Sequence, residues 1–376
     1  MLSLYIHIPF CVGKCPYCGF YSTQYVPKRA DGFIGALRRE AAGRHDEFRE
    51  RVFESVYIGG GTPTVLSLEH QCGIRGIITD HFTIADAAEF TVEANPNTVS
   101  QDTLSAWRRS GANRLSLGVQ SFSEDVLRIL GRRHTTEQAI SAYKVARKAG
   151  FRNIGMDLIY GVPGQTMEQW KETLDAAIRL GPEHLSLYSL SLDEGSVFLR
   201  EAEAGRIAMP EDEFVVEMYE CGVAALSRAG FLRYEISNFS LPGLECRHNM
   251  NYWQRGEYLG LGPSAWSFFS GRRLQNIADG EEYARRLEDG GRVVAYAETP
   301  DAEQASRETI LLNLRTASGM DLGRYEREHG ALFRNRLKRN MGPLETAGLL
   351  EVRNGRMTLT DRGIVLSNEA LSRLSS

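Results

Sequence analysis

Six short apolar runs, each followed by a stretch with helical periodicity, limit the possible folds of this chain more than any other feature. The runs are rich in aliphatic and β-branched residues and span 3–8, 55–59, 89–94, 114–119, 153–159 and 184–190. The helical stretches between them include 31–49, 101–110, 135–149 and 167–180. Strands that alternate with helices predict βαβ units and a parallel sheet. Six units are too few for an eight-fold barrel, so a partial barrel and an open doubly wound sheet both fit.

The alternation loosens after residue 190, and the chain divides into three predicted parts. Residues 1–230 carry the strand–helix repeats, 231–295 are expected to be an irregular extension, and 296–376 form a C-terminal domain. In that last part, helical segments lead into two short alternating runs around Asn354-Gly355, which is a hairpin signal. Helices followed by a small hairpin resemble a winged helix. We expect a packing or lid role there, because twelve basic against ten acidic residues in 301–376 are too balanced to bind nucleic acid.

The overall composition is that of an ordinary globular protein. Charged residues make up 24% of the chain and its formal net charge is −4. No apolar run is long enough for a membrane span, and the N-terminus lacks the pattern of a signal peptide. We therefore expect a cytoplasmic protein without an integral membrane segment, although transient membrane contact stays compatible with this. Cytoplasmic thiols stay reduced, which favours a metal or redox site over a disulfide framework.

Three cysteines stand together just after the first apolar run. Cys11, Cys15 and Cys18 have the spacing C-x3-C-x2-C. Thiolates at these offsets can converge on one iron–sulfur cluster and leave one iron without a protein ligand, as in metal sites with an open position. Structural zinc normally takes four ligands with paired C-x2-C spacing, and no second pair follows. The spacing favours an iron–sulfur site, with a zinc knuckle or unrelated buried thiols as alternatives.

The cysteine motif resembles that of the radical S-adenosylmethionine superfamily. Tyr17 precedes the last cysteine, and "YIGGGTPT" (57–64) follows the second strand, where that superfamily keeps a glycine-rich turn. The resemblance implies a 4Fe–4S cluster on the three cysteines and S-adenosylmethionine at the fourth iron. It also implies a partial (β/α)6 TIM-like barrel with a smaller, mostly helical C-terminal domain. An electron donor would supply the electron that cleaves S-adenosylmethionine to a 5′-deoxyadenosyl radical.

Polar residues follow several of the predicted strands, at the edge where parallel α/β folds bind ligands. Glu93, Gln120, Arg132 and Asp157 each stand at or just beyond an apolar run, and any one alone would be read as a helix cap or a solvated strand end. Together they are similar to the coproporphyrinogen-oxidase-like branch of the superfamily, which opens with "YIHIPFC". That similarity implies contacts to S-adenosylmethionine from Tyr5, Tyr17, Gly60, Gly61, Thr62, Glu93, Gln120, Arg132 and Asp157.

One departure from the oxidases and one further motif point to another group within this branch. Oxygen-independent coproporphyrinogen III oxidases carry a fourth cysteine where this chain has Phe20, and C-x3-C-x2-C-x-F is similar to HemW-type haem chaperones. That group also carries H-N-x-x-Y-W, which reads "HNMNYW" at 248–253. An imidazole can ligate haem iron and aromatic rings can cover a porphyrin face. The resemblance thus implies His248, Tyr252 and Trp253 as haem-binding candidates, whereas a lone histidine is usually just a hydrogen-bonded residue.

The resemblance implies a protein that binds haem and passes it to acceptor proteins. The alternative is an oxygen-independent coproporphyrinogen III oxidase, which makes protoporphyrinogen IX by radical oxidative decarboxylation. A haem-independent radical enzyme with another substrate is a third hypothesis. No catalytic residue is assigned from the sequence.

Overall fold

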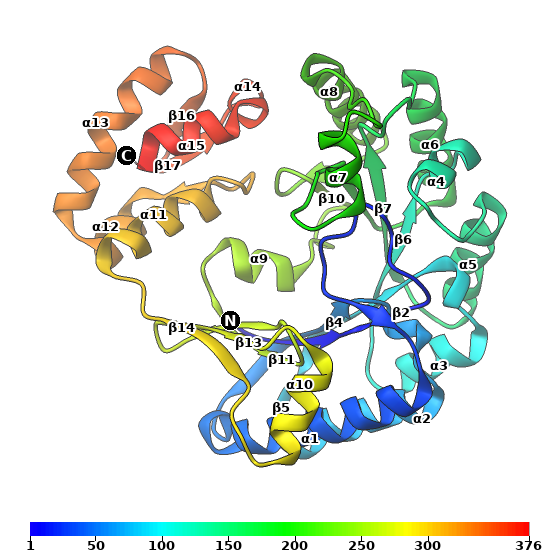
Figure 1. Ribbon diagram of the computed structural model, residues 1–376. Helices are drawn as coiled ribbons and strands as arrows, with labels where there is room; N and C mark the ends of the chain where they lie inside the picture. Colours follow the sequence, from blue (N-terminus) through cyan, green and yellow to red (C-terminus); the bar gives the residue numbers. More distant parts are fainter. Residues whose placement is uncertain (376) are drawn as a thin grey trace.

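The computed structural model describes residues 1–375, and six parallel strands form its centre (Figure 1). They lie side by side in chain order, each parallel to the next. All six apolar runs predicted as strands are therefore confirmed. The strands are β1 (Leu2–Ile8), β4 (Val52–Gly60), β5 (Thr83–Ala94), β6 (Arg114–Gln120), β7 (Asn153–Tyr160) and β8 (His184–Ser189).

Helices on the outer side of the curved sheet connect these strands, which gives the α/β partial barrel that the resemblance implies (Figure 1). Apolar side chains pack between the sheet and the helices. Trp107 and Trp170, for example, are fully buried and belong to this core. The indole of Trp170 also donates to the carbonyl of Met218 at 2.8 Å, which ties two of the helices together. The helices are α1 (Pro27–Phe48), α2 (Leu68–His81), α3 (Gln101–Arg109), α4 (Glu124–Ile129), α5 (Thr136–Lys148), α6 (Met167–Leu180) and α8 (Asp212–Arg228).

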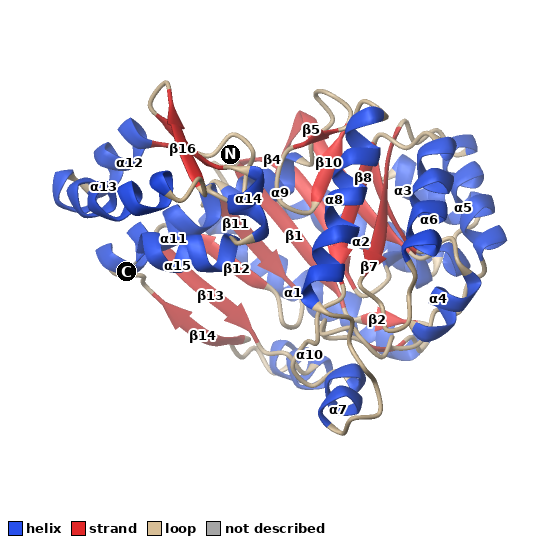
Figure 2. Ribbon diagram, turned by 90° about the horizontal axis from the view of Figure 1, so that it is seen from above, coloured by secondary structure: helices blue, strands red, loops and turns tan. Residues whose placement is uncertain are grey.

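The sheet continues beyond the six repeats on both sides, as Figure 2 shows from above. The short strands β10 (Asn238–Ser240) and β9 (Leu232–Arg233) extend it beyond β8, and helix α7 (Val197–Glu203) lies in the preceding loop. On the other side β11 (Glu257–Leu261) pairs in parallel with β1. Antiparallel strands β12 (Trp266–Phe269), β13 (Arg272–Asn276) and β14 (Val294–Glu298) follow it, and helix α10 (Gly280–Glu288) precedes β14.

The prediction of an irregular extension over 231–295 is therefore wrong in one respect. Its central part is regular and adds strands to the main sheet. Strands of four or five residues with interspersed polar side chains give too weak an alternation to be recognised in the sequence. A tight turn at Ser270-Gly271, with φ of 50° and 71°, joins two of them.

The C-terminal part has the element order of a winged helix: helix, strand, two helices and a hairpin. Asn354 and Gly355 have φ of 50° and 75°, which confirms the predicted turn between the hairpin strands. The predicted boundary at residue 296 falls inside β14. The elements are α11 (Ala302–Asn313), β15 (Met320–Asp321), α12 (Leu322–His329), α13 (Ala331–Thr346), β16 (Leu350–Arg353), β17 (Arg356–Leu359), α14 (Asp361–Val365) and α15 (Ser367–Ser375).

Two further segments shape the functional region. The cysteine loop contains the short paired strands β2 (Phe10–Cys11) and β3 (Thr23–Gln24). Helix α9 (Arg247–Trp253) lies between the barrel and the C-terminal domain (Figure 1). Among residues 1–375, no helix is both long and apolar enough to cross a membrane.

Candidate functional site

The glycine-rich turn after β4 holds the cysteine loop in place. The backbone N–H of Gly61 donates to the carbonyl of Ile8 at 2.8 Å, and that of Thr62 donates to Phe10 at 2.7 Å. A Cβ at Gly61 would lie 2.5 Å from both of these carbonyl oxygens. Gly60 has φ of 96°, a conformation that side-chain-bearing residues rarely adopt. The glycines are therefore needed for the close approach of the loop that carries the thiols.

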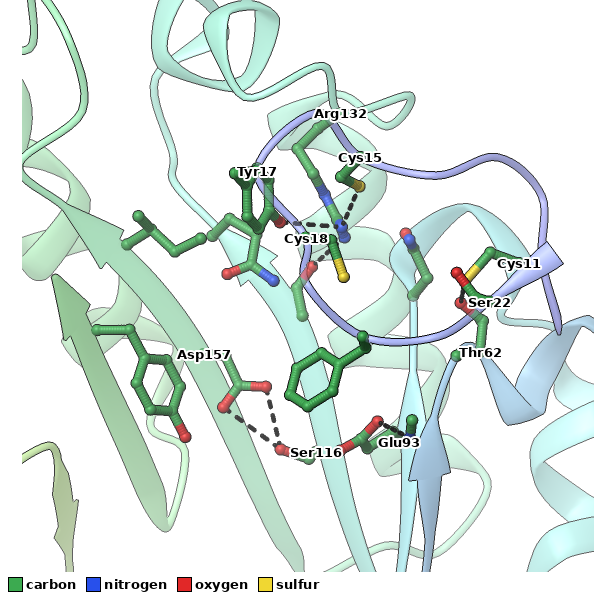
Figure 3. Close-up of a pocket in the computed structure, with 18 of the residues that line it drawn as sticks. Cys11, Cys15, Tyr17, Cys18, Ser22, Thr62, Glu93, Ser116, Arg132 and Asp157 are labelled. Carbon is green, nitrogen blue, oxygen red and sulfur yellow. Dashed lines mark hydrogen bonds between the residues drawn. The ribbon is translucent and has the colours of Figure 1, made fainter. Parts of the chain in front are cut away.

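The three cysteines line a cavity of about 470 Å³ at the carboxyl ends of the strands, here called the cysteine cavity (Figure 3). All three are free thiols. The hydroxyl of Thr62 donates to the Sγ of Cys11 at 3.4 Å, and the guanidinium of Arg132 donates to the Sγ of Cys15, also at 3.4 Å. Burial raises the pKa of Cys18. Within residues 1–375, no three Cys, His, Asp or Glu side chains are grouped closely enough for a single metal ion.

Two buried carboxyl groups lie on the strand side of this cavity. Glu93 accepts hydrogen bonds from the Tyr57 hydroxyl at 2.7 Å and from the Gly60 N–H at 3.1 Å. Burial, reinforced by the nearby charge of Asp157, raises the pKa of Glu93 to about 7. Asp157 accepts from the Ser116 hydroxyl at 3.2 Å, and burial raises its pKa as well (Figure 3). Ligand hydroxyl or amine groups could therefore bind these carboxyls.

A second cavity of about 600 Å³ lies next to the first and is here called the aromatic cavity. Gly19, Phe20, Gly60 and Glu93 line both cavities and mark their junction. Phe20 is 65% exposed, which is unusual for a large apolar side chain. The walls combine rings from the cysteine loop, α9 and the added strands with two arginines. These residues are Tyr21, Tyr252, Tyr258, Trp266, Phe268, Arg255 and Arg273.

The histidine of the "HNMNYW" motif is buried in a hydrogen-bonded network. The Nδ1 of His248 lies 2.9 Å from the hydroxyl of Ser55, and Nε2 lies 2.9 Å from the hydroxyl of Tyr252. Because Ser55 donates to Ser3, it accepts from Nδ1–H, and Nε2 accepts from Tyr252. Burial lowers the pKa of His248 to about 3, so that the ring is neutral. Its imidazole also packs on Tyr57, with 5.0 Å between ring centroids.

The comparisons with known proteins agree along the whole chain. Residues 5–177 match the radical SAM superfamily, and residues 301–366 match the HemN C-terminal domain. "Heme chaperone HemW" of Bacillus subtilis is 33% identical over 372 residues, which cover 98% of each chain. The protein of the same name from Mycobacterium tuberculosis is 35% identical over 377 residues, covering 99% of this chain and 94% of that one.

The chain belongs to the HemW family. A related fold is seen in the solved structure of coproporphyrinogen III oxidase (HemN) from Escherichia coli, described as a radical SAM enzyme. The two superpose with a TM-score of 0.88 at 26% identity, over 100% of this chain and 90% of that one. The HemW family is thus built on the same architecture as that oxidase.

Membership of the radical SAM superfamily implies a 4Fe–4S cluster and S-adenosylmethionine, and the cysteine cavity of this HemW-family chain fits both. Besides the three thiols, it is lined by residues with buried polar atoms that have no partner among the described residues. Such orphan atoms call for an external partner. They are the Oδ1 of Asn95, the Nε of Arg114, the Nε of Arg132, the Nδ1 of His184 and the Oδ1 of Asn238. Gln120, at the end of β6, has φ of 69°, a strained backbone typical of functional sites.

The structure gathers almost all the predicted cofactor residues of this HemW-family chain in the cysteine cavity. They are Cys11, Cys15, Cys18, Tyr17, Gly60, Gly61, Thr62, Glu93, Gln120, Arg132 and Asp157. Tyr5 differs, because it lines the aromatic cavity and lies with its hydroxyl 3.0 Å from the Nδ1 of His7. Tyr252 lines the aromatic cavity too, whereas His248 and Trp253 are absent from the described walls of both.

Sequence reasoning missed further polar residues of the cysteine cavity. Arg114 and Ser116 come from β6, and His184 and Ser186 come from β8. Each of these strands places a polar side chain at every second position among aliphatic ones. That alternation within an otherwise buried strand was the available signal, since it marks the face turned toward the barrel interior.

Proposed function

We propose that this chain is a haem chaperone, which binds haem and passes it to acceptor proteins in the cytoplasm. The observation that carries the proposal is the match along nearly the whole chain to relatives named "Heme chaperone HemW" at 33% and 35% identity. Phe20 supports it, because the resemblance implies a cysteine at this position in the oxidases.

The cofactor roles follow from the cysteine cavity. Cys11, Cys15 and Cys18 would hold the 4Fe–4S cluster, which, once reduced by an electron donor, supplies an electron for cleavage of S-adenosylmethionine. Arg132 would hold the Cys15 sulfur in position, because its guanidinium lies within hydrogen-bond distance of that sulfur. Glu93 and Asp157 would bind hydroxyl or amine groups of S-adenosylmethionine. Tyr17, Gly60, Gly61, Thr62 and Gln120 complete the proposed contacts.

Haem ligation by His248 requires a rearrangement. Both ring nitrogens are bonded, and the hydroxyl of Tyr252 covers Nε2 at 2.9 Å. Since Tyr252 itself lines the aromatic cavity, a turn of its side chain would release Nε2 toward that cavity. We propose His248 as the iron ligand on this condition, with Tyr252 and Trp253 as flanking rings.

A transfer assay tests the chaperone function. The anaerobically purified chain is loaded with haemin, freed of excess haemin, and mixed with apomyoglobin as a general haem acceptor. We expect the chain to retain haem through the separation step and then to release it to apomyoglobin. Loss of all haem in the separation step, or retention without any transfer, would contradict the proposal.

The structural match to HemN is the one observation that favours the oxidase as a second candidate. Incubation with coproporphyrinogen III, S-adenosylmethionine and a reductant distinguishes the two. A chaperone yields no protoporphyrinogen IX, whereas stoichiometric formation of that product would favour the oxidase.

A further inference from the structure

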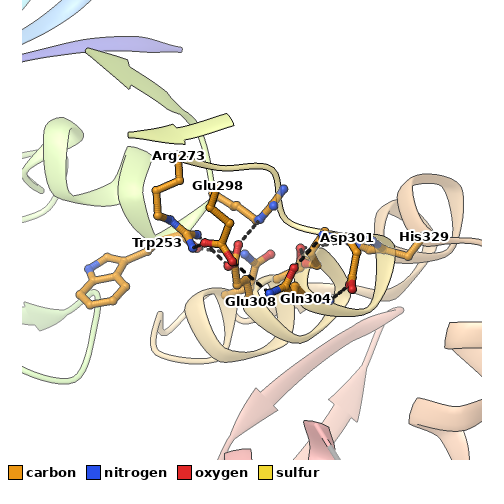
Figure 4. A network of polar contacts seen from close by, with 11 residues as sticks. Trp253, Arg273, Glu298, Asp301, Gln304, Glu308 and His329 are labelled. Carbon is orange, nitrogen blue, oxygen red and sulfur yellow. Dashed lines mark hydrogen bonds and ion pairs between the residues drawn. The ribbon is translucent and has the colours of Figure 1, made fainter. Parts of the chain in front are cut away.

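Two arginines of the aromatic cavity share one carboxylate from the C-terminal domain. Figure 4 labels Arg273, Glu298 and Glu308 of this network. The Nε of Arg255 donates to Glu308 of α11 at 2.8 Å, and the Nη2 of Arg273 donates to the other oxygen of Glu308 at 2.7 Å. Arg273 also donates to Glu298 at 3.1 Å. Glu308 therefore bridges the end of α9 and strand β13, and each of its oxygens binds one guanidinium.

The two guanidinium groups are fixed by more than this bridge. The Cζ atoms of Arg255 and Arg273 lie 4.7 and 6.0 Å from the centroid of the Phe268 ring. Their side chains are only 20% and 27% exposed. A guanidinium that is packed on an aromatic ring loses little further freedom when it binds a planar anion. The pair is thus pre-organised at the wall of the cavity.

The backbone conformation at Arg255 is energetically unfavourable. Arg255 has φ of 55°, a left-handed conformation in which glycine or asparagine is expected. Gly256 follows it, and a Cβ there would lie 1.9 Å from the Oδ1 of Asn251. The turn after α9 therefore keeps a long cationic side chain where a small residue would be less strained. Such an outlier supports a functional role for the side chain.

The chemistry of the cavity suits one class of ligand. Its aromatic walls favour a flat conjugated ring system. Each guanidinium carries five N–H donors, of which Arg255 gives one and Arg273 gives two to Glu298 and Glu308. Carboxylates bind such groups through paired, charge-assisted hydrogen bonds. A volume of about 600 Å³ lies within the range of small-molecule sites.

We propose that Arg255 and Arg273 anchor the carboxylates of a planar tetrapyrrole in the aromatic cavity, where these carboxylates replace Glu308. This inference rests on the proposed haem-binding function and names the residues that receive the propionate groups. Glu308 acts as an internal competitor from the C-terminal domain, so that ligand binding exchanges one carboxylate for another at the same two cations.

The test uses iron-free protoporphyrin IX and its dimethyl ester, which separate carboxylate anchoring from iron ligation. Both are titrated anaerobically into the full-length, cluster-loaded chain, and porphyrin fluorescence gives the affinities. We expect the diacid to bind at least about tenfold more tightly than the diester. The double substitution Arg255→Gln and Arg273→Gln should lower diacid affinity to that of the diester. Lysine at both positions should restore part of the affinity difference between diacid and diester, because the positive charges are kept. The restoration should be incomplete, because lysine lacks the planar guanidinium.

A separate variant and matched controls test whether Glu308 competes with the ligand. Glu308→Gln should raise the affinity for the diacid severalfold and leave that for the diester unchanged. Glu303 lies on the same helix and pairs with Arg307 and Arg336, and Arg336 packs 5.2 Å from the Phe333 centroid. Since Glu303 and Arg336 line neither cavity, Glu303→Gln and Arg336→Gln should change neither affinity.

The proposed carboxylate anchoring would be overturned if the wild-type chain bound diacid and diester with equal affinity. It would also be overturned if the double glutamine variant lost affinity for both ligands to the same extent. If haemin still binds in either case, the proposed chaperone function stands and the anchor alone is wrong. If neither haemin nor any porphyrin binds, both proposals fail. Circular dichroism and thermal unfolding identify a variant that has lost its fold, and the lysine variant then serves in its place.

Discussion

The guanidinium of Arg132 donates a hydrogen bond to the Sγ of Cys15 at 3.4 Å, across 117 residues of sequence. It also donates to the carbonyl of Gly118 at 2.7 Å, near the end of β6. The cysteine loop is thus tied to the strand ends by a buried cation. Because cations near an iron–sulfur cluster favour its reduced form, this contact would link the fold of the barrel to the redox behaviour of a cluster held at the proposed ligand Cys15.

Replacing Arg132 by glutamine should make the reduction potential of the cluster more negative. One positive charge is lost at hydrogen-bond distance from Cys15, a proposed cluster ligand, which is worth on the order of 50–150 mV. Redox titration monitored by electron paramagnetic resonance measures this shift. Arg128→Gln is the control, since the exposed Arg128 side chain on α4 pairs with Asp125 at 2.7 Å. Identical potentials in wild type and Arg132→Gln would contradict the prediction.

Glu93 should make the protein without S-adenosylmethionine less stable at alkaline pH. Its pKa rises from 4.5 to about 7 in the fold, chiefly through burial. Between these values the folded state binds more protons than the unfolded state, so that stability falls as the pH rises. The Glu93→Gln variant has no titrating group at this position. From pH 4.5 to pH 8, the free energy of unfolding of wild type should therefore fall by roughly 3 kcal/mol relative to that of the variant. Urea unfolding of both proteins across this range tests the prediction, and parallel stability curves would refute it.

His248 should contribute to stability and to its loss in acid. His248→Gln leaves the buried hydroxyls of Ser55 and Tyr252 with a poorer partner, at a cost of about 1–3 kcal/mol at pH 7.5. Because burial lowers the pKa of His248 from 6.5 to about 3, the unfolded state binds more protons between these values. Wild type should therefore lose roughly 1.4 kcal/mol per pH unit relative to the variant as the pH falls from 6 to 4. Chemical denaturation at three pH values measures both effects. A difference in the free energy of unfolding between wild type and variant that does not change with pH would exclude a neutral buried imidazole.

Phe20 should matter for ligand binding and not for folding. Its side chain is 65% exposed and lines both cavities, so Phe20→Ala should change the free energy of unfolding by less than about 0.5 kcal/mol. Loss of one aromatic contact should weaken haemin binding about two- to tenfold. Leu332→Ala is the control, because Leu332 is 79% exposed on α13 and should alter neither quantity. Unchanged haemin affinity in Phe20→Ala would remove the ring from the ligand site.

The sequence was informative where the signal is local. The six central strands were predictable because aliphatic runs of five to seven residues alternate with amphipathic helices. Part of the cysteine cavity was predictable, because the resemblance to a known family pointed to polar residues at or just beyond these strands, whereas Arg114, Ser116, His184 and Ser186 were missed. The added strands β11 to β13 were not, since four or five residues with mixed polarity carry little periodicity. Pairing of β11 with β1 is a long-range contact, and it brings Tyr258 and Tyr5 to the wall of the same aromatic cavity.

The role of the "HNMNYW" motif shows a second limit of the sequence. The residues were identified, but the contacts of His248 come from Ser55 on β4 and from the neighbouring Tyr57 ring. The bridge from Glu308 to Arg255 and Arg273 likewise joins three separate segments. No local pattern reports that these side chains meet, because their proximity depends on how α9 and the C-terminal domain pack against the sheet.

The folded chain should bind haem. This is tested by adding haemin to the chain under anaerobic conditions and following the absorbance in the Soret region. We expect a saturable shift of the Soret band with one haem per chain in protein that carries its cluster. Absorbance that rises linearly without saturation, as for free haemin, would contradict it.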